Sequence, residues 1–151
     1  TQQWDAGLVQ GGAINIFNWV DTDADGIQDA VPSEQAGLAG VNISLTTTQW
    51  AHDFGTSNAN GLVAFTNVRP GNYALQALRS GYNRTLQNVG GDDNIDSDAD
   101  VATGNTASFF VGPAATVNHL DVGFIDASVP TGAINGKIWL DNGDGIRQST
   151  E

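Results

Sequence analysis

The chain has no cysteine and no methionine among its 151 residues, and only five of its residues are lysine or arginine. The absence of cysteine excludes disulfide bonds, thiolate metal sites and cysteine nucleophiles. Because basic residues are so few, no basic stripe is available to bind nucleic acid or an anionic membrane surface. The sequence also lacks an apolar run long enough to cross a membrane, so we expect no membrane insertion.

Acidic residues, by contrast, are numerous and unevenly distributed. Aspartate and glutamate together number 17 and give a formal net charge of −12. Thirteen of them fall in three short windows, which contain Asp21, Asp23, Asp25, Asp29 and Glu34, then Asp92, Asp93, Asp96, Asp98 and Asp100, then Asp141, Asp144 and Glu151. Carboxylates crowded this closely repel one another unless a cation neutralises them. The distribution therefore predicts binding of Ca²⁺, a hard cation that takes oxygen ligands.

A strand-like segment followed by an acidic loop occurs twice. Residues 13–29 read AINIFNWVDTDADGIQD and residues 133–148 read AINGKIWLDNGDGIRQ, with 120 residues between Asp21 and Asp141. This period indicates a tandem repeat, of which the chain holds one whole unit and parts of its neighbours. We expect residues 10–130 to be one complete calcium-binding repeat. Residues 1–9 would be the last strand of a preceding repeat or an exchanged strand, and residues 131–151 the first strand and calcium loop of a following repeat.

Apolar residues alternate with a period of two in several segments, whereas a helical period is hard to find. Val41, Ile43 and Leu45, for example, are predicted to point inward from one strand. The predicted strands are residues 13–20, 41–45, 62–66, 73–78, 107–111 and 120–125, and turn residues separate them. About seven short strands of this kind predict an all-β fold, an antiparallel β-sandwich. Residues 48–59 and 88–105 are predicted to be long connections, the second of them ordered by metal.

The first acidic loop has the spacing of an EF-hand-type calcium loop. Glycine stands at position six, Ile27 offers its carbonyl at position seven, and side-chain oxygens at positions one, three, five and nine come from Asp21, Asp23, Asp25 and Asp29. Pro32 occupies position twelve, where a bidentate acid is expected, so Glu34 is the candidate substitute. A solvated, aspartate-rich turn is the alternative interpretation.

The second acidic window, residues 90–100, reads GGDDNIDSDAD. Its alternating aspartates at 96, 98 and 100 would surround one ion if the loop curls, with Asp92 and Asp93 beside them. An exposed flexible loop is the alternative. Asp5 and Asp121, each in a repeated Asp-x-Gly motif, are weaker candidates, because a turn residue at a strand end explains them equally well.

The third window belongs to the second copy of the repeated segment. Asp141 and Asp144 front a loop that is one residue shorter before its glycine, and Glu151 falls where position twelve is expected. This site could equally be weak or incomplete.

Taken together, these motifs resemble the B-type repeats of bacterial serine-aspartate-repeat surface adhesins. The resemblance rests on residues 19–29, 37–45, 56–65 and 90–100 and extends over nearly the whole chain. It implies a calcium-binding Ig-like or prealbumin-like β-sandwich, related to collagen-adhesin B-type domains, located outside the cell or on its surface. Some relatives carry a Lys–Asn isopeptide bond, but Phe17 stands where the second copy has Lys137, so the complete repeat is not expected to form one.

We therefore expect a non-catalytic, calcium-stabilised structural repeat of an extracellular surface protein, stalk or fibre. Its partners would be neighbouring repeats or copies of itself. An enzyme is not expected, because no nucleophile–base constellation is visible. Two alternatives stay open. One is an adhesion module that binds a carbohydrate or protein, such as a host, matrix or glycan ligand, through Trp50 and neighbouring loops. The other is a filament subunit assembled by β-strand addition through its terminal strands.

Overall fold

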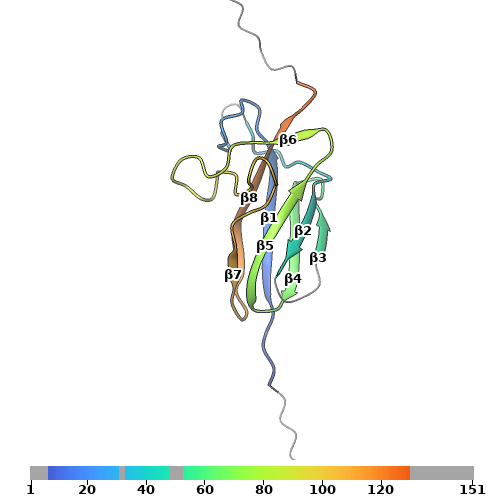
Figure 1. Ribbon diagram of the computed structural model, residues 1–151, viewed down its shortest axis with the longest axis vertical. Helices are drawn as coiled ribbons and strands as arrows, with labels where there is room; N and C mark the ends of the chain where they lie inside the picture. Colours follow the sequence, from blue (N-terminus) through green and yellow to red (C-terminus); the bar gives the residue numbers. More distant parts are fainter. Residues whose placement is uncertain (1–6, 31–32, 48–52, 130–151) are drawn as a thin grey trace, which may run out of the picture.

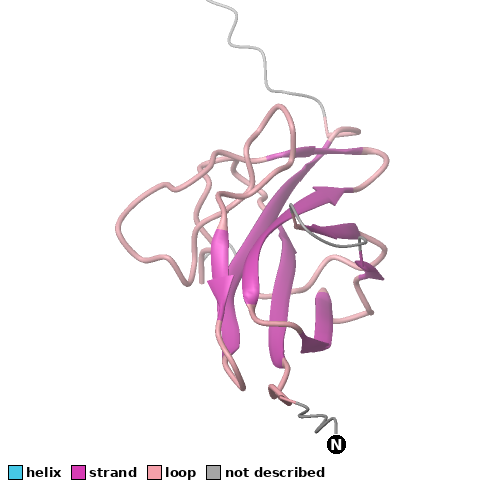
Figure 2. Ribbon diagram, turned by 60° about the horizontal axis from the view of Figure 1, so that its bottom comes forward, coloured by secondary structure: helices cyan, strands magenta, loops and turns pink. Residues whose placement is uncertain are grey.

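The computed structural model describes residues 7–30, 33–47 and 53–129, and all of its regular structure is β-strand (Figures 1 and 2). Two four-stranded sheets pack face to face, one in the order β4-β1-β8-β6 and the other in the order β3-β2-β5-β7. The strands are β1 (Gly12–Val20), β2 (Asn42–Thr46), β3 (Asp53–Thr56), β4 (Leu62–Val68), β5 (Gly71–Leu78), β6 (Tyr82–Arg84), β7 (Phe109–Val111) and β8 (Thr116–Asp126). The predicted all-β sandwich is confirmed.

Among the strands of the described ranges, all pairs but one are antiparallel. β1 lies between β4 and β8, and it runs antiparallel to β4 but parallel to β8. Alternation along a sequence identifies strands without their direction, so the parallel pair was not predicted. Because β1 and β8 run the same way, β1 begins at one end of the sandwich and β8 ends at the other (Figure 1).

Two of the eight strands in the described chain were not predicted. β3 lies within the segment 48–59 that we expected to be a connection, and β6 has only three residues. Gly55 weakens the strand signal of β3. The structure needs this glycine, because a Cβ there would lie 2.6 Å from the Cγ1 atom of Val63.

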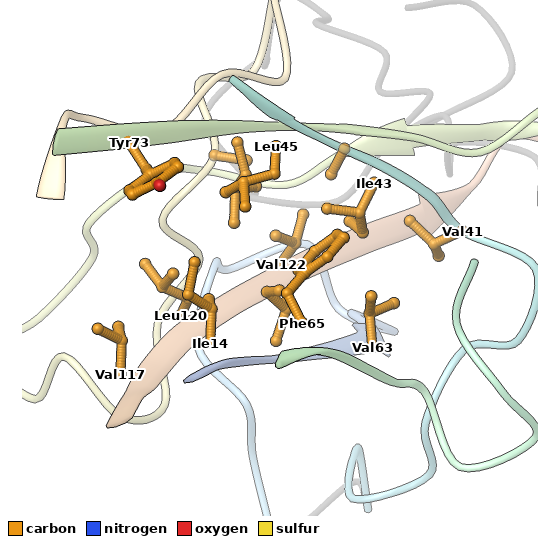
Figure 3. Packing of buried hydrophobic residues seen from close by; sticks show 14 of the residues in the cluster. Ile14, Val41, Ile43, Leu45, Val63, Phe65, Tyr73, Val117, Leu120 and Val122 are labelled. Carbon is orange, nitrogen blue, oxygen red and sulfur yellow. The ribbon is translucent and has the colours of Figure 1, made fainter. Parts of the chain in front are cut away.

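The core lies between the two sheets (Figure 3). The alternation in β2 and just before it is confirmed, since Val41, Ile43 and Leu45 are all buried. Ile14 from β1 and Leu75 from β5 are fully buried in the same core. Full burial of an aliphatic side chain of this size contributes about 1.5–3 kcal/mol to folding, so the core holds the two sheets together.

Trp19 lies on the opposite face of β1 from Ile14 and Ile16, yet it is also fully buried. A Cβ on Gly123 of β8 would lie 2.7 Å from the Trp19 ring and 2.5 Å from Cγ2 of Thr85. The tryptophan is therefore packed beneath the connections at the loop end of the molecule, outside the inter-sheet core. In the described part of the chain, no helical segment has the length and apolarity that a bilayer crossing requires.

Candidate metal centres

The two acidic loops that the structure describes meet at one end of the sandwich. The loop of residues 21–29 follows β1, and the loop of residues 85–108 connects β6 to β7 (Figure 1). An isolated antiparallel bridge joins Ile27 to Asp96, and the amide of Gln28 donates to the carbonyl of Ile95 at 2.6 Å. The two loops are therefore in direct contact at this end of the sandwich.

The first loop is shaped by Asp21, which is almost fully buried at the end of β1. Its carboxylate accepts hydrogen bonds from the amides of Ala24 at 2.6 Å and Gly26 at 2.9 Å, and from the hydroxyl of Thr85. Gly26 has a φ of +89°, and a Cβ there would lie 2.8–2.9 Å from Val89 and Leu86. The sharp turn predicted at position six is thus present, and it requires glycine.

Glu34 lies where the first loop returns, and it is 2% exposed. One of its carboxylate oxygens accepts from the amide and hydroxyl of Thr22, at 2.5 and 2.8 Å, and the other accepts from the amide of Asp29 at 3.0 Å. The residue that we predicted to replace position twelve is therefore already a hydrogen-bonded member of the loop.

The carboxylates of the first window converge in two overlapping groups. Ligand oxygens of Asp21, Asp23 and Glu34 lie within 4.8 Å of one another, and so do those of Asp23, Asp25 and Asp29. Asp23 is common to both groups and exposed. The pKa of Asp23 is raised by desolvation and by the charges of Asp25, Glu34 and Asp21. The structure thus brings together all five acidic residues predicted from this window.

Ile27, the predicted carbonyl ligand, is half-buried. Its amide donates to the carboxylate of Asp25 at 2.8 Å, and its side chain lies 3.7 Å from the position of a Cβ on Gly90. Its side chain therefore packs against the second acidic loop.

In the second window, the ligand oxygens of Asp93, Asp96 and Asp98 lie within 4.8 Å of one another. Asp96 is only 4% exposed, and its Oδ1 atom is buried with no hydrogen-bond partner. Burial, followed by the charges of Asp93 and Asp92, raises the pKa of Asp96. A buried carboxylate oxygen without a donor is costly, and a cation beside it would remove that cost.

Asp121 of β8 lies beside this group, because its amide donates to the carboxylate of Asp98 at 2.8 Å. We name the four residues Asp93, Asp96, Asp98 and Asp121 the second cluster. Burial, then the charges of Asp98, Asp96 and Asp93, raises the pKa of Asp121 to about 7. Burial also raises the pKa of Asp98 to about 6, although a hydrogen bond from the amide of Asp121 opposes the change. The charges of Asp93 and Asp96 thus raise the pKa of both Asp98 and Asp121, and a concentration of negative charge of this kind suits a divalent cation.

Asp92 and Asp100, also predicted as ligands, have a different local role. The carboxylate of Asp92 accepts from the amide and side chain of Asn94, and that of Asp100 accepts from the amide and hydroxyl of Thr103. These bonds hold the pKa of each carboxyl below its usual range. Neither residue belongs to a converging carboxylate group in the described ranges; each caps a turn.

The remaining predicted ligands, Asp141, Asp144 and Glu151, lie outside the described residues, as do Asp5 and Trp50. His119 of β8 is exposed, and its Nδ1 atom lies 3.2 Å from the carboxylate of Asp93. The alternative interpretation of Asp121 as a turn residue at a strand end is wrong, because Asp121 lies inside β8. The signal that was available is a carboxylate inside a strand, between the buried Leu120 and Val122.

The carboxylates of the first window and those of the second cluster are both chemically suited to calcium. Every ligand that they offer is an oxygen, and calcium takes six to eight oxygens in a flexible geometry, whereas zinc sites usually include nitrogen or sulfur. The partnerless oxygen of Asp96 and the buried Asp121 indicate that a turn-forming role alone does not explain the second cluster.

Comparison with known proteins identifies a family and supports the fold. A family model described as the SdrD B-like domain matches residues 12–124. The chain is 35% identical over 141 residues to the serine-aspartate repeat-containing protein C of Staphylococcus aureus strain Newman, and also to that of strain N315. These alignments cover 91% of the chain but only 14% of the relative. The chain thus spans a small part of the curated relatives it matches.

Among solved structures, the minor pilin GBS52 of Streptococcus agalactiae superposes with a TM-score of 0.50. The sequences are 12% identical, and the match covers 86% of this chain and 50% of the pilin chain. At this identity the likeness concerns the fold alone, and it agrees with the β-sandwich.

Proposed function

The chain belongs to the SdrD B-like domain family, and from this premise we propose that it is a non-catalytic structural repeat of an extracellular surface protein, stalk or fibre, stabilised by bound calcium. The observation that carries the calcium proposal is the second cluster. Its carboxylates come from a loop and from a strand in the middle of a sheet, and two of them are nearly fully buried. No sequence-local turn requires that arrangement.

The electrostatics of the second cluster support the need for a cation. Burial of an ionised carboxylate costs several kcal/mol unless a partner compensates it. Among the described residues, the basic group paired with this cluster is His119, whose contact with Asp93 is exposed to solvent. Calcium held by Asp93, Asp96, Asp98 and Asp121 would supply the missing positive charge.

Calcium at each group would connect segments that are far apart in the sequence. At the second cluster it would tie the loop of residues 90–100 to β8. At the group of Asp21, Asp23 and Glu34, it would tie the start of the first loop to the segment at Glu34, where that loop returns. Because Ile27 and Asp96 bridge the two loops, both ions would act on the same end of the sandwich. The proposed consequence is a rigid loop end in a protein without disulfide bonds.

The proposed partners are neighbouring repeats or copies of the same chain, on the cell surface. The supporting feature is the placement of β1 and β8, which begin and end at opposite ends of the sandwich (Figure 1). Domains of this shape suit an end-to-end series. Two alternatives stay predictions: a filament built by terminal strands and a ligand site at Trp50. Trp50 and most of the terminal residues lie outside the described ranges, and residues 7–9 of the predicted strand 1–9 are described but form no strand.

The experiment is thermal unfolding in calcium and in a calcium chelator, followed by calorimetry. Binding to the folded state raises the free energy of unfolding by about 2.7 kcal/mol when calcium is at 100 times its dissociation constant, so the midpoint should rise. Asp96→Asn should reduce this rise, whereas the matched variant Asp92→Asn, at a turn-capping aspartate in the same loop, should keep it. An unchanged midpoint in the parent protein would overturn the proposal.

A further inference from the structure

Two rows of side chains on the outer face of the sheet β3-β2-β5-β7 are uncharged, in contrast to the acidic loop end. Ser44 on β2 pairs with Phe54 on β3 and with Gln76 on β5. In the next outward-facing row, Asn42 pairs with Thr56 and Leu78. All six side chains are uncharged, in a chain whose net charge is −12.

These two rows border a hollow of about 420 Å³. Phe54, which is 76% exposed, and Leu78, which is 46% exposed, contribute apolar surface. Hydroxyl and amide groups of Asn42, Ser44 and Gln76 contribute polar surface. The volume falls within the range of small-molecule sites, roughly 300–1,000 Å³, and the combination of apolar area with a few polar groups is typical of them.

A second hollow of about 290 Å³ continues along the same two strands. Thr46, Asn72 and Ala74 line it, and no carboxylate, ammonium or guanidinium group contributes to either hollow. From Leu78 to Asn72 the strand advances by roughly 20 Å, at about 3.3 Å per residue. The two hollows therefore form an extended, uncharged track along β2 and β5.

Polar groups in the first hollow are already held in place. The Nε2 atom of Gln76 donates to the carbonyl of Thr103 at 3.0 Å, and the hydroxyl of Thr56 donates to the side-chain oxygen of Asn42 at 3.2 Å. Side chains fixed before binding lose less entropy when a ligand arrives.

We propose that this track binds a neutral oligosaccharide laid along β2 and β5. Charge selects this ligand class, because the surrounding molecule repels anions and the track offers no acid to attract a cation. A sugar chain presents hydroxyls to the amide and hydroxyl groups and its C–H faces to Phe54 and Leu78. An extended chain of several sugar rings also matches the length of the track.

The test is binding of the calcium-loaded protein to immobilised neutral oligosaccharides built from glucose, xylose, mannose or N-acetylglucosamine, with sialylated and sulfated glycans as charged comparators. Titration calorimetry then gives the affinity of the best neutral glycan. Phe54→Ala should weaken that affinity about tenfold or more, because the aromatic contact is lost. Leu62→Ala is the control, since Leu62 is 45% exposed on β4, in the other sheet, and borders neither hollow.

Three results would overturn the proposal. One is no retention of any neutral glycan at millimolar concentration. Another is equal loss of binding in Phe54→Ala and Leu62→Ala. The third is a concentration-dependent dimer in sedimentation that Phe54→Ala dissociates, which would identify the face as a contact between copies. Calcium-dependent melting of each variant is measured in parallel, so that failure of glycan binding is distinguished from failure of the calcium proposal.

Discussion

Asp98 and Asp121 exchange two hydrogen bonds, although 23 residues separate them in the sequence. The amide of Asp98 donates to the carbonyl of Asp121 at 2.8 Å, and the amide of Asp121 donates to the carboxylate of Asp98, also at 2.8 Å. The backbone thus fixes the two residues side by side while their carboxylates repel. The pair concentrates negative charge at β8, at the calcium site that we propose.

Replacing Asp121 by Asn should change stability in opposite directions with and without calcium. In chelator the midpoint of thermal unfolding should rise, because the variant removes a buried acid whose pKa is raised to about 7 by burial and by its acidic neighbours. Calcium affinity, measured by titration calorimetry, should fall about tenfold or more, or about 1.4 kcal/mol.

Asp126→Asn is the control for this variant. Asp126 lies at the end of the same strand, and its carboxylate accepts from the amide and hydroxyl of Ser128. Its calcium affinity should match that of the parent protein. Equal calcium affinity in Asp121→Asn and the parent would contradict a role for Asp121 at the ion.

Replacing Glu34 by Ala should destabilise the protein even when calcium is absent. The substitution leaves the amides of Thr22 and Asp29 without their acceptor at a site that is 2% exposed. Loss of a buried acceptor costs about 1–3 kcal/mol. Urea unfolding in chelator measures this cost. Ser33→Ala, at the exposed neighbouring position, should change the free energy of unfolding by no more than about 0.5 kcal/mol.

Stability without calcium should fall as the pH rises from about 4 to 7. Asp98 and Asp121 have pKa values raised to about 6 and about 7 in the folded protein. In this range the folded state therefore binds more protons than the unfolded state, and linkage makes the free energy of unfolding decrease with pH. The carboxyls with lowered pKa values, such as Asp92, titrate below this range.

Calcium should reverse that trend, because protons compete with the ion for the same oxygens. The calcium-induced rise in the unfolding midpoint should therefore be larger at pH 7 than at pH 5. Midpoints recorded across this range in calcium and in chelator provide the comparison. A chelator series that gains stability from pH 5 to 7 would contradict the assignment of these two carboxylates.

Replacing Gly123 by Ala should destabilise the loop end. The added Cβ would lie 2.5 Å from Thr85 and 2.7 Å from the ring of Trp19, which is fully buried. Overpacking of this kind costs about 1–3 kcal/mol, and urea unfolding measures it. Gly91→Ala is the matched control, because a Cβ added there would have nothing within 4 Å. Equal stability of the two variants would show that Trp19 can move aside.

Local patterns in the sequence identified the parts of the fold that depend on near neighbours. Burial of Val41, Ile43 and Leu45 follows from alternation alone. Alternation did not predict β3, because its Phe54 is exposed and its Gly55 is a poor strand residue. This strand forms because β2 offers it a partner, and pairing of that kind is a property of the folded chain.

In the acidic windows, too, contacts between near neighbours could be predicted from the sequence, whereas contacts between distant residues could not. Asn94 and Thr103, two and three residues after Asp92 and Asp100, determine that these aspartates cap turns. That relationship was available in the sequence. The place of Asp121 beside Asp98 was not, because it depends on how the loop folds back onto β8. Calcium occupancy itself stays a prediction.

The parallel pairing of β1 with β8 has a mechanical consequence. A force that pulls Gly12 and Asp126 apart would act along both strands in opposite directions, because these residues lie at opposite ends of the sandwich (Figure 1). The ladder from Ala13 to Val20 would then be loaded in shear, so its hydrogen bonds would have to rupture together and could not open one after another. We therefore expect the domain to resist tension applied between these two ends.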